Sequence, residues 1–492
     1  MPKLPKITPR SAWLIAATLI LARSFVFVVF EGAYFDSDQA IIGLMAKHLS
    51  EFKAFPLYFY GQSYLLTISA WLAAPFVGIL GASVFALKIP LLLLNLLFEW
   101  LLLRILIVNC GLTAGRALTT TLFFCLAPVI TASRLVEMAG GNIEPFIFIL
   151  LLWILRDRPW LSGIAMGLGY LNRPFVLYGI LAVVFLRLKK TPSYFFQHPK
   201  NLIRGLIQFS CGFAAVYLMI LFLKPFSSNS FGAAVQSSLH FSWEDVHWLF
   251  TDNIATLMAY RDDLLSNYAI HSSLTSGHSI LNSSIYLSLI AIAISITFKT
   301  TSKKFLKNAS ISHSTEFPAY LICVSLFSAL GYILMAPLVR NNMLIRYNLL
   351  FTLLPIGLST WIYQNRIKGL TGRSQSILTV VIILWSSIQS YDHFRLVQEY
   401  LIAPPSNPHR NLAQYLEDHQ INCGLAPYWT SYHIDFLSSE RLKIQSYEYV
   451  RIPEYSSFEH TCALITPVGT PPRCPAPAKV DDWQICVGKL TS

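Results

Sequence analysis

Long apolar runs recur along the whole chain, and they constrain its fold more than any other feature of the sequence. A helix that crosses a bilayer needs about 20 mostly apolar residues, and fewer where neighbouring protein shields its ends. The 492 residues are 54% hydrophobic and only 13% charged, whereas soluble domains carry about 25% charged residues. One buried core cannot hold so many apolar runs. The sequence therefore predicts an all-helical polytopic membrane protein with about eleven spans.

Lys and Arg residues flank these runs unevenly, and basic residues near span ends stay on the cytoplasmic side. The first run, 11–30, follows Lys3, Lys6 and Arg10 and has no small-residue cleavage site after it, so we expect it to remain as an anchor. The other spans are expected at 85–108, 117–133, 143–155, two short halves within 159–187, 202–223, 280–298, 319–335, a run ending before Arg366, and 377–390. This pattern predicts a cytoplasmic N-terminus and an outer C-terminus.

The chain is expected to divide into a membrane domain, 1–391, and a small extracytoplasmic α/β domain, 392–492. The first outer loop, 31–84, contains two amphipathic or apolar pieces, 38–52 and 64–80, that are expected to lie along the membrane surface. The last hundred residues instead mix a helical stretch with short strand-like runs.

Charge and cysteine content agree with this arrangement. The net charge of +12 comes from Lys and Arg dispersed among the expected inner loops, so it does not indicate nucleic-acid binding. Four cysteines fall in the polar tail, at Cys423, Cys462, Cys474 and Cys486. In an oxidising compartment they would form two disulfides in one of three pairings, with free thiols as the alternative.

Two carboxylates, Asp36 and Asp38, directly follow the first apolar run. They are either the start of a solvated loop or part of a functional site, because acids at an outer span end cost little when they reach water. Other polar side chains recur at outer span ends, and we expect them to line one pocket with the two acids; they are Glu137, Asn142, Glu144, Arg173, Arg340 and Arg346. Asp36 and Asp38 also form a D-x-D pattern, which leaves a divalent cation open as a cofactor.

Several motifs occur in a fixed order along the chain: "YFDSDQAIIGLMAKHLSEFKAFPLYFYGQSYL", "GGNIEP", "NRPF" and "RYNLLFTLLPIGL". In this order they resemble the multispan glycosyltransferases of the GT-C class, most closely the bacterial family related to protein O-mannosyltransferases and aminoarabinose (lipid A) transferases. That family opens its first outer loop with an acidic pair, usually Asp-Glu, and Asp38-Gln39 occupies this place. Residues 428–444, "YWTSYHIDFLSSERLKI", look like the tail of the bacterial relatives. The chain departs from the pattern at Gln39 and at Ser69, where an acid is expected.

The resemblance implies transfer of a sugar, with inversion, from a polyprenyl-phosphate donor to a lipid, glycan or protein acceptor at the outer face of the inner (plasma) membrane. Asp38, with Asp36 nearby, is the expected general base. Arginine binds phosphate oxygens in a bidentate way, so the expected donor-binding residues are Arg346, Arg173 and Arg340. The expected acceptor- and sugar-binding residues are Glu144, Asn142, Tyr58, Tyr60 and Gln62, with core packing as the alternative for the two tyrosines.

A second hypothesis is a lipid or glycan transporter, or a non-catalytic protein of envelope assembly. Transporters tend to show repeated halves and broken helices near the midplane of the membrane. This chain has no evident internal repeat, and its polar clusters gather at the outer span ends, which favours the enzyme. Neither hypothesis identifies the sugar or the acceptor.

Overall fold

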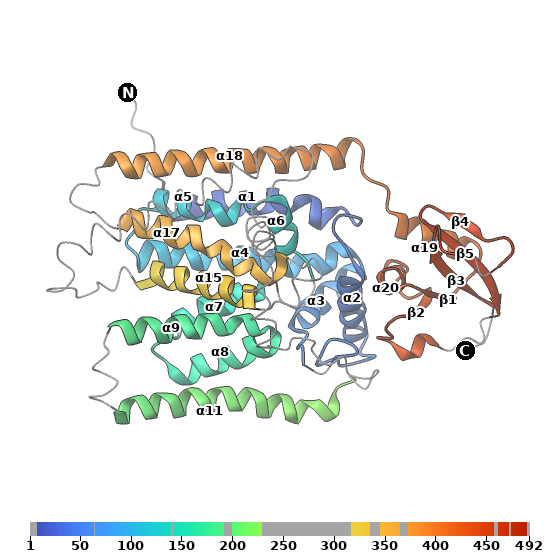
Figure 1. Ribbon diagram of the computed structural model, residues 1–492, viewed down its shortest axis with the longest axis horizontal. Helices are drawn as coiled ribbons and strands as arrows, with labels where there is room; N and C mark the ends of the chain where they lie inside the picture. The colour runs from blue at the N-terminus through green and yellow to red at the C-terminus, as the bar shows by residue number, and fades with distance from the viewer. Residues whose placement is uncertain are drawn as a thin grey trace, which may run out of the picture.

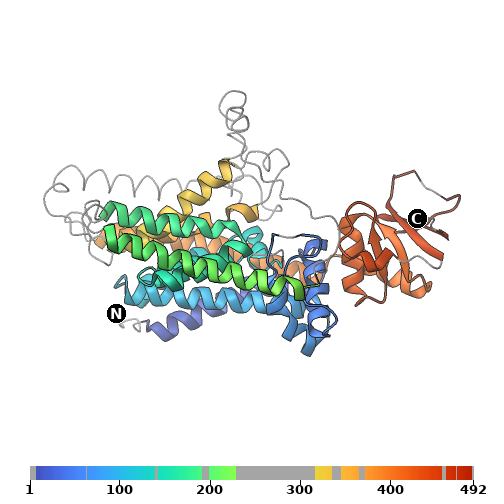
Figure 2. The same cartoon turned by 90° about the horizontal axis from the view of Figure 1, so that it is seen from below.

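A computed structural model of the protein describes residues 7–62, 64–138, 142–190, 199–228, 316–334, 345–364, 372–456, 461–471 and 474–489. Long helices run side by side through most of the molecule, and a small domain with a β-sheet follows them (Figures 1 and 2). The first helix, α1 (Pro9–Val29), begins at the end of the helical bundle opposite to this small domain. The expected span at 280–298 lies outside the described residues.

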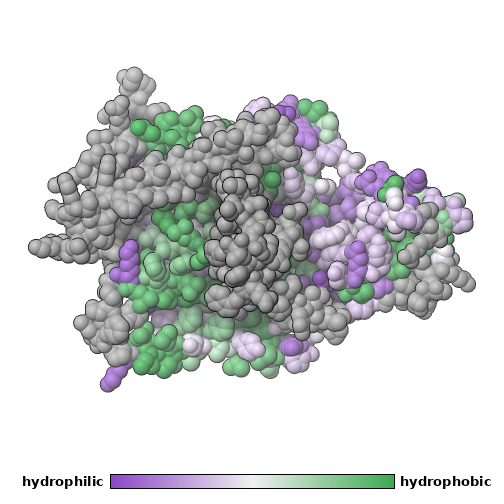
Figure 3. Space-filling view, in the orientation of Figure 1, coloured by the Kyte–Doolittle hydropathy of each residue, from purple (hydrophilic) through white to green (hydrophobic). Residues whose placement is uncertain are grey.

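Most of the helices that form the bundle match the expected apolar runs. They are α1 (Pro9–Val29), α4 (Val84–Val108), α5 (Ala114–Cys125), α7 (Glu144–Ile154), α8 (Pro159–Asn172), α9 (Leu177–Lys190), α11 (Pro199–Leu223), α15 (Glu316–Leu334), α17 (Leu353–Gln364) and α18 (Gly372–Ile402). Short 3-10 segments, η1 (Pro174–Val176), η2 (Lys224–Phe226) and η4 (Ile345–Thr352), connect to them. Where the bundle is coloured in Figure 3, apolar side chains predominate.

Only some of these helices are long and apolar enough to cross a membrane alone. Within the described residues these are Pro9–Val29, Val84–Val108 and Lys200–Phe226. A fourth is counted if α5 and α6 (Val129–Leu135) form one span, but the two helices meet at 88°. Pro128, at the N-cap of α6, cannot donate a helical hydrogen bond, so the span expected over 117–133 is bent there. The structure thus supports a multispan helical protein, while eleven spans stay a prediction.

Two helices of the first outer loop lie between the bundle and the small domain (Figure 1). They are α2 (Ser37–Ser50) and α3 (Ile68–Leu80), which pack against each other. These bounds match the pieces expected at 38–52 and 64–80.

The small C-terminal domain is of the expected α/β type. It contains α19 (Pro408–Asp418), β1 (Cys423–Ala426), α20 (Tyr428–Leu437), β2 (Lys443–Ser446), η5 (Pro453–Ser456), β3 (Thr461–Pro467), β4 (Ala478–Val480) and β5 (Trp483–Lys489). The strand order is β2-β1-β3-β5-β4, with β1 parallel to β2 and β3, and β5 antiparallel to β3 and β4. The helix α18 continues to Ile402, so the domain begins after that residue and not after 391. Apolarity ends near 390, but the helix extends into the polar sequence that follows.

Two disulfides join the four cysteines of this domain. Cys423 pairs with Cys462 at a Cα–Cα distance of 4.9 Å, and Cys474 pairs with Cys486 at 5.7 Å. The first pair follows from the sheet, because β1 and β3 are neighbouring strands with Gly424 opposite Ala463.

The main apolar core does not stop at the edge of the bundle. It continues from the bundle through α2 into α20, where Tyr432 and Phe436 are fully buried within the same cluster. A separate cluster, which includes Leu416, Ile444 and Ile465, forms the interior of the sheet domain. The C-terminal domain is therefore packed onto the first outer loop by a continuous apolar contact.

Candidate active site at the junction of the two domains

Asp36 and Asp38 stand at the beginning of α2, and the structure gives them different roles. Asp36 is the N-cap residue, and its Oδ1 accepts a hydrogen bond of 3.0 Å from the backbone N–H of Gln39. Aspartate is preferred at this position because its side chain satisfies an amide that the helix leaves unpaired. Asp38 lies in the first turn, where the helix dipole favours a negative charge. Asp36 thus has a structural role, and Asp38 is the stronger candidate for chemistry.

Asp38 is half-buried and contacts the C-terminal domain directly. The hydroxyl of Tyr428, the first residue of α20, donates a hydrogen bond of 2.7 Å to Asp38 Oδ1. Burial, and next the charge of Asp38, raise the pKa of the Tyr428 phenol, so the phenol remains a donor at neutral pH. The candidate base is therefore held by a residue that lies 390 positions away in the sequence.

Arg451 packs beside Tyr428 and adds a positive charge to the same place. Its guanidinium carbon is 5.6 Å from the centre of the Tyr428 ring and 5.5 Å from that of the Phe59 ring, which cation–π attraction stabilises. Nη1 donates hydrogen bonds of 3.3 and 3.4 Å to the carbonyl oxygens of Gly61 and Tyr60. Nε is buried and has no hydrogen-bond partner among the described residues. This guanidinium thus joins the C-terminal domain to the first outer loop.

The surroundings of Gln39 explain why an amide stands where the resembling family usually has an acid. Gln39 is buried; its Nε2 donates a hydrogen bond of 2.9 Å to the Tyr34 carbonyl, and its Oε1 accepts one of 3.2 Å from the Met138 N–H. An ionised glutamate has no proton to donate to the Tyr34 carbonyl. Position 39 therefore needs an amide in this chain, and Gln39 links α2 to the loop after α6.

A second polar group surrounds Glu144 at the start of α7. Ser69 Oγ donates a hydrogen bond of 2.8 Å to Glu144 Oε1, and the charge of Arg173 interacts with the same carboxylate. An acid at position 69 would place two carboxylates side by side, which like-charge repulsion disfavours. The serine is therefore compatible with Glu144. The structure thus brings together two of the predicted site residues, Glu144 and Arg173.

Asn142 orders the loop that precedes α7. Its Nδ2 donates hydrogen bonds of 2.9 Å to the Arg134 carbonyl and 3.3 Å to Glu137 Oε2. Arg134 Nη1 lies 2.7 Å from the same oxygen of Glu137. These contacts occupy both hydrogens of the Asn142 amide and favour a role in loop structure.

Three residues of the first outer loop that were expected to contact a sugar lie in different surroundings. Tyr58 packs in an apolar cluster with Val216 and Ile220 of α11, which agrees with the core-packing alternative. Tyr60 is buried, and its hydroxyl lies 2.8 Å from His48 Nδ1. Gln62 has a buried amide oxygen with no hydrogen-bond partner among the described residues. Gln62 is therefore the best placed of the three to bind a polar ligand.

The structure does not describe the side chains of two predicted phosphate-binding residues. Arg340 lies outside the described residues. Arg346 lies on η4, but its side chain is outside the described part of the chain. That Arg346 shares a cavity with Asp38 stays a prediction.

Glu440 makes another contact between the C-terminal domain and α2. His48 Nε2 and the Tyr455 hydroxyl each lie 2.7 Å from Glu440 Oε1, and Lys47 Nζ pairs with Oε2. Burial raises the pKa of Glu440, but hydrogen bonds and charges from His48 and Lys47 outweigh burial, so the pKa lies well below its usual range. These four residues line a cavity of about 430 Å³.

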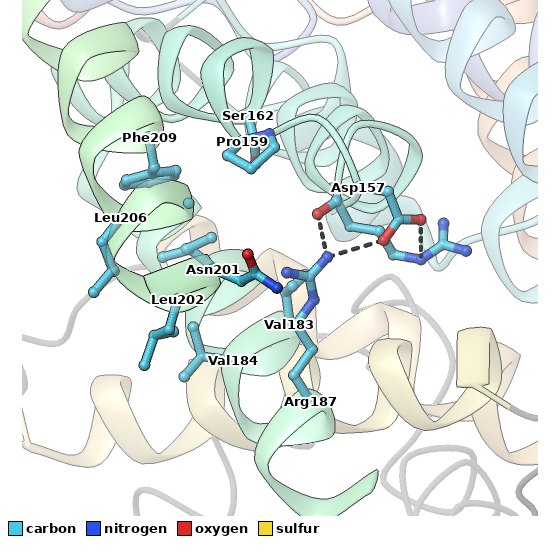
Figure 4. A pocket seen from close by; sticks show the side chains of 13 residues that line it. Asp157, Pro159, Ser162, Val183, Val184, Arg187, Asn201, Leu202, Leu206 and Phe209 are labelled. Atoms are coloured by element: carbon cyan, nitrogen blue, oxygen red, sulfur yellow. Dashed lines mark hydrogen bonds and ion pairs between the residues drawn. The ribbon is translucent and has the colours of Figure 1, made fainter. Parts of the chain in front are cut away.

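A larger cavity, of about 690 Å³, lies between α8, α9 and α11 (Figure 4). Apolar side chains such as Val184 and Phe209 line much of it, and Arg187 forms an ion pair of 2.9 Å with Asp157 at its edge. The ends of α9 and α11 that border this cavity lie far from α2 in Figure 1. It is therefore separate from the Asp38 site.

No group of three or more His, Cys, Asp or Glu side chains within the described ranges has the arrangement to hold a metal ion. The capping role of Asp36 supplies another reason for the D-x-D pattern.

Three residues at this junction, Tyr428, Arg451 and Glu440, are absent from the prediction made from sequence. Tyr428 and Glu440 do lie in the segment 428–444 that resembles the tail of the bacterial relatives, and this was the one available signal. No spacing rule connects Asp38 to a tyrosine so distant in the chain.

The chain is similar to a solved structure, although its sequence matches no known family model. No family model matches the chain, and no curated protein matches it. Among solved structures, the chain is similar to the crystal structure of ArnT from Cupriavidus metallidurans bound to undecaprenyl phosphate. The identity is 14%, the similarity covers 97% of this chain and 98% of that chain, and the TM-score is 0.43.

Proposed function

We propose that this protein is an integral membrane glycosyltransferase of the GT-C class. It moves a sugar from a polyprenyl-phosphate-linked donor to a lipid, glycan or protein acceptor at the outer face of the inner membrane. The observation that carries the proposal is the placement of Asp38, a half-buried carboxylate at the start of α2 that accepts a hydrogen bond from Tyr428. The ordered motifs of the membrane region support the same class.

Asp38 acts as the general base in this proposal. The acceptor hydroxyl oxygen attacks the anomeric carbon while Asp38 takes its proton. The bond between the anomeric carbon and the phosphate oxygen breaks, and the electron pair leaves with the phosphate. Attack from the face opposite the leaving group inverts the anomeric carbon. A positioned base contributes about 10² to 10⁴ in rate.

The departing phosphate carries negative charge that must be stabilised, and guanidinium groups do this through paired hydrogen bonds. We assign this role to Arg173, Arg346 and Arg340. The charge of Arg173 already interacts with the Glu144 carboxylate. Glu144 Oε2 is buried and has no hydrogen-bond partner among the described residues, which supports Glu144 as an acceptor or sugar contact. Gln62 offers its amide oxygen in the same way.

The proposal includes about eleven spans, a cytoplasmic N-terminus and a periplasmic C-terminal domain. Reporter fusions test this orientation. A C-terminal reporter that is active in the cytoplasm would contradict it, because the Asp38 site would then face the wrong side of the membrane.

Asp38→Asn and Asp36→Asn form a matched pair for testing the base. Both substitutions remove one negative charge, and Asn caps a helix about as well as Asp, so Asp36→Asn preserves the start of α2. We expect Asp38→Asn to lower turnover about 10² to 10⁴-fold with donor binding largely retained. Asp36→Asn should affect donor or metal binding more than turnover. Ordinary turnover by Asp38→Asn, measured with defined polyprenyl-phosphate sugars, would refute the assignment.

A further inference from the structure

The surface between α2 and α20 is packed too closely to be a loose contact between domains. A Cβ atom added at Gly43 of α2 would lie 2.7 Å from Cδ2 and 2.9 Å from Cζ of Phe436 on α20. The Phe436 ring also lies 5.6 Å from the ring of Phe35, just before α2. Polar contacts border this apolar centre: Arg410 pairs with Glu31 on one side. The two helices therefore hold a fixed relative position.

Tyr428 stands in this interface with its ring and backbone both held. Its backbone N–H donates a hydrogen bond of 3.0 Å to Glu448 Oε2. The rings of Tyr432 and Tyr449 meet the Tyr428 ring edge to face, at 5.6 and 6.1 Å between centroids. Arg451 covers part of the same ring. A phenol fixed in this way presents its hydroxyl at one place and in one direction.

We propose that Tyr428 is a positioning residue for Asp38, so that the C-terminal domain completes the active site of the membrane domain. This inference rests on the proposed function, because it assigns Asp38 a reaction to perform. A carboxylate on a short side chain rotates among several orientations unless a neighbour fixes it, and a misplacement of about 1 Å can cost about 10²-fold in rate. The 2.7 Å hydrogen bond from Tyr428 limits that rotation.

The hydrogen bond also has a chemical effect that packing alone would not have. Donation to a charged carboxylate stabilises its ionised form and weakens it as a base. Removal of the phenolic hydroxyl should therefore move the acidic limb of the pH–rate profile toward higher pH. A residue that only supports the fold would leave this limb in place.

Tyr428→Phe tests the proposal, with Tyr391→Phe as its control. Both keep the aromatic ring and lose one hydroxyl, but Tyr391 lies on α18 with an exposed side chain. We expect Tyr428→Phe to lower kcat about 10- to 100-fold, the loss typical of a hydrogen bond to a charged group. The KM for a polyprenyl-phosphate sugar should change little, and the acidic limb should shift toward higher pH. Tyr391→Phe should behave as the unmutated protein.

Amide hydrogen exchange of α2, measured on the same samples, separates positioning from support of the fold. Unchanged exchange with a lowered kcat and a shifted profile supports positioning. A lowered kcat with faster exchange in α2 and an unshifted profile overturns it in favour of a structural role. Normal rates and an unshifted profile for Tyr428→Phe also overturn it, while the proposed function stands. If the unmutated protein transfers no sugar, the proposed function itself fails.

Discussion

Gly43→Ala is the smallest change that should separate α20 from α2. The added methyl group would lie 2.7 and 2.9 Å from two ring carbons of Phe436, closer than a Cβ atom approaches other atoms in proteins. Phe436 is fully buried, so its ring has little room to move away. Overpacking of this kind costs about 1 to 3 kcal/mol. The equilibrium between docked and undocked forms should therefore shift by about 5- to 150-fold.

Gly205→Ala is the matched control, because it also replaces a glycine inside a helix. Its Cβ would meet its nearest atom, Pro159 Cγ, only at 4.0 Å. Alanine favours a helix over glycine by about 1 kcal/mol, and this gain applies to both variants. The difference between them therefore measures the clash at Gly43.

Amide hydrogen exchange followed by mass spectrometry reports the docked state directly. We expect the peptides of α2 and α20 to exchange faster in Gly43→Ala and to stay unchanged in Gly205→Ala. Adding Phe436→Leu to Gly43→Ala should restore part of the protection, because the two positions are in direct contact. Equal exchange in Gly43→Ala and Gly205→Ala would refute the close packing of the two helices.

Two further results are expected from the same junction. Gln39→Glu should lower the unfolding temperature, because it removes the hydrogen bond to the Tyr34 carbonyl and places a carboxylate at a buried position, at a cost of about 1 to 3 kcal/mol. The exposed Gln398→Glu should not lower it, and equal melting of the two variants would contradict the role of Gln39. The depressed pKa of Glu440 implies stability that is present above its ordinary value of 4.5 and lost as the pH falls toward the folded-state value. Thermal unfolding between about pH 3 and pH 7 should show this loss, and Glu440→Gln should reduce it; an identical pH dependence in both proteins would rule out this contribution.

Sequence periodicity and hydropathy predicted the helices well where local sequence features determine the helix ends. The two helices of the first outer loop, α2 and α3, begin and end near the expected residues, because apolar spacing is a local feature. The span expected over 117–133 is bent by 88° near Pro128, and hydropathy does not record such a bend. Hydropathy also ended the last helix too early, because α18 continues as a polar helix to Ile402.

Local sequence patterns say less about the site than about the fold, for a physical reason. Asp38 was chosen as the candidate base from its place after the first apolar run, and that role stays a prediction; the residue that holds its carboxylate, Tyr428, comes from a different domain. Contacts between residues so far apart depend on tertiary packing, which local patterns do not encode. The apparent departures at Gln39 and Ser69 likewise become intelligible only from their neighbours, the Tyr34 carbonyl and Glu144.

Sugar transfer that depends on Asp38 is tested most directly by mass spectrometry of envelope glycans and glycolipids. Three strains are compared: one without the gene, one complemented with the unmutated gene, and one complemented with Asp38→Asn at equal protein level. We predict a species heavier by one sugar residue in the strain with the unmutated gene and its loss in the other two. Full modification in the Asp38→Asn strain, or identical profiles in all three strains, would contradict the proposed reaction.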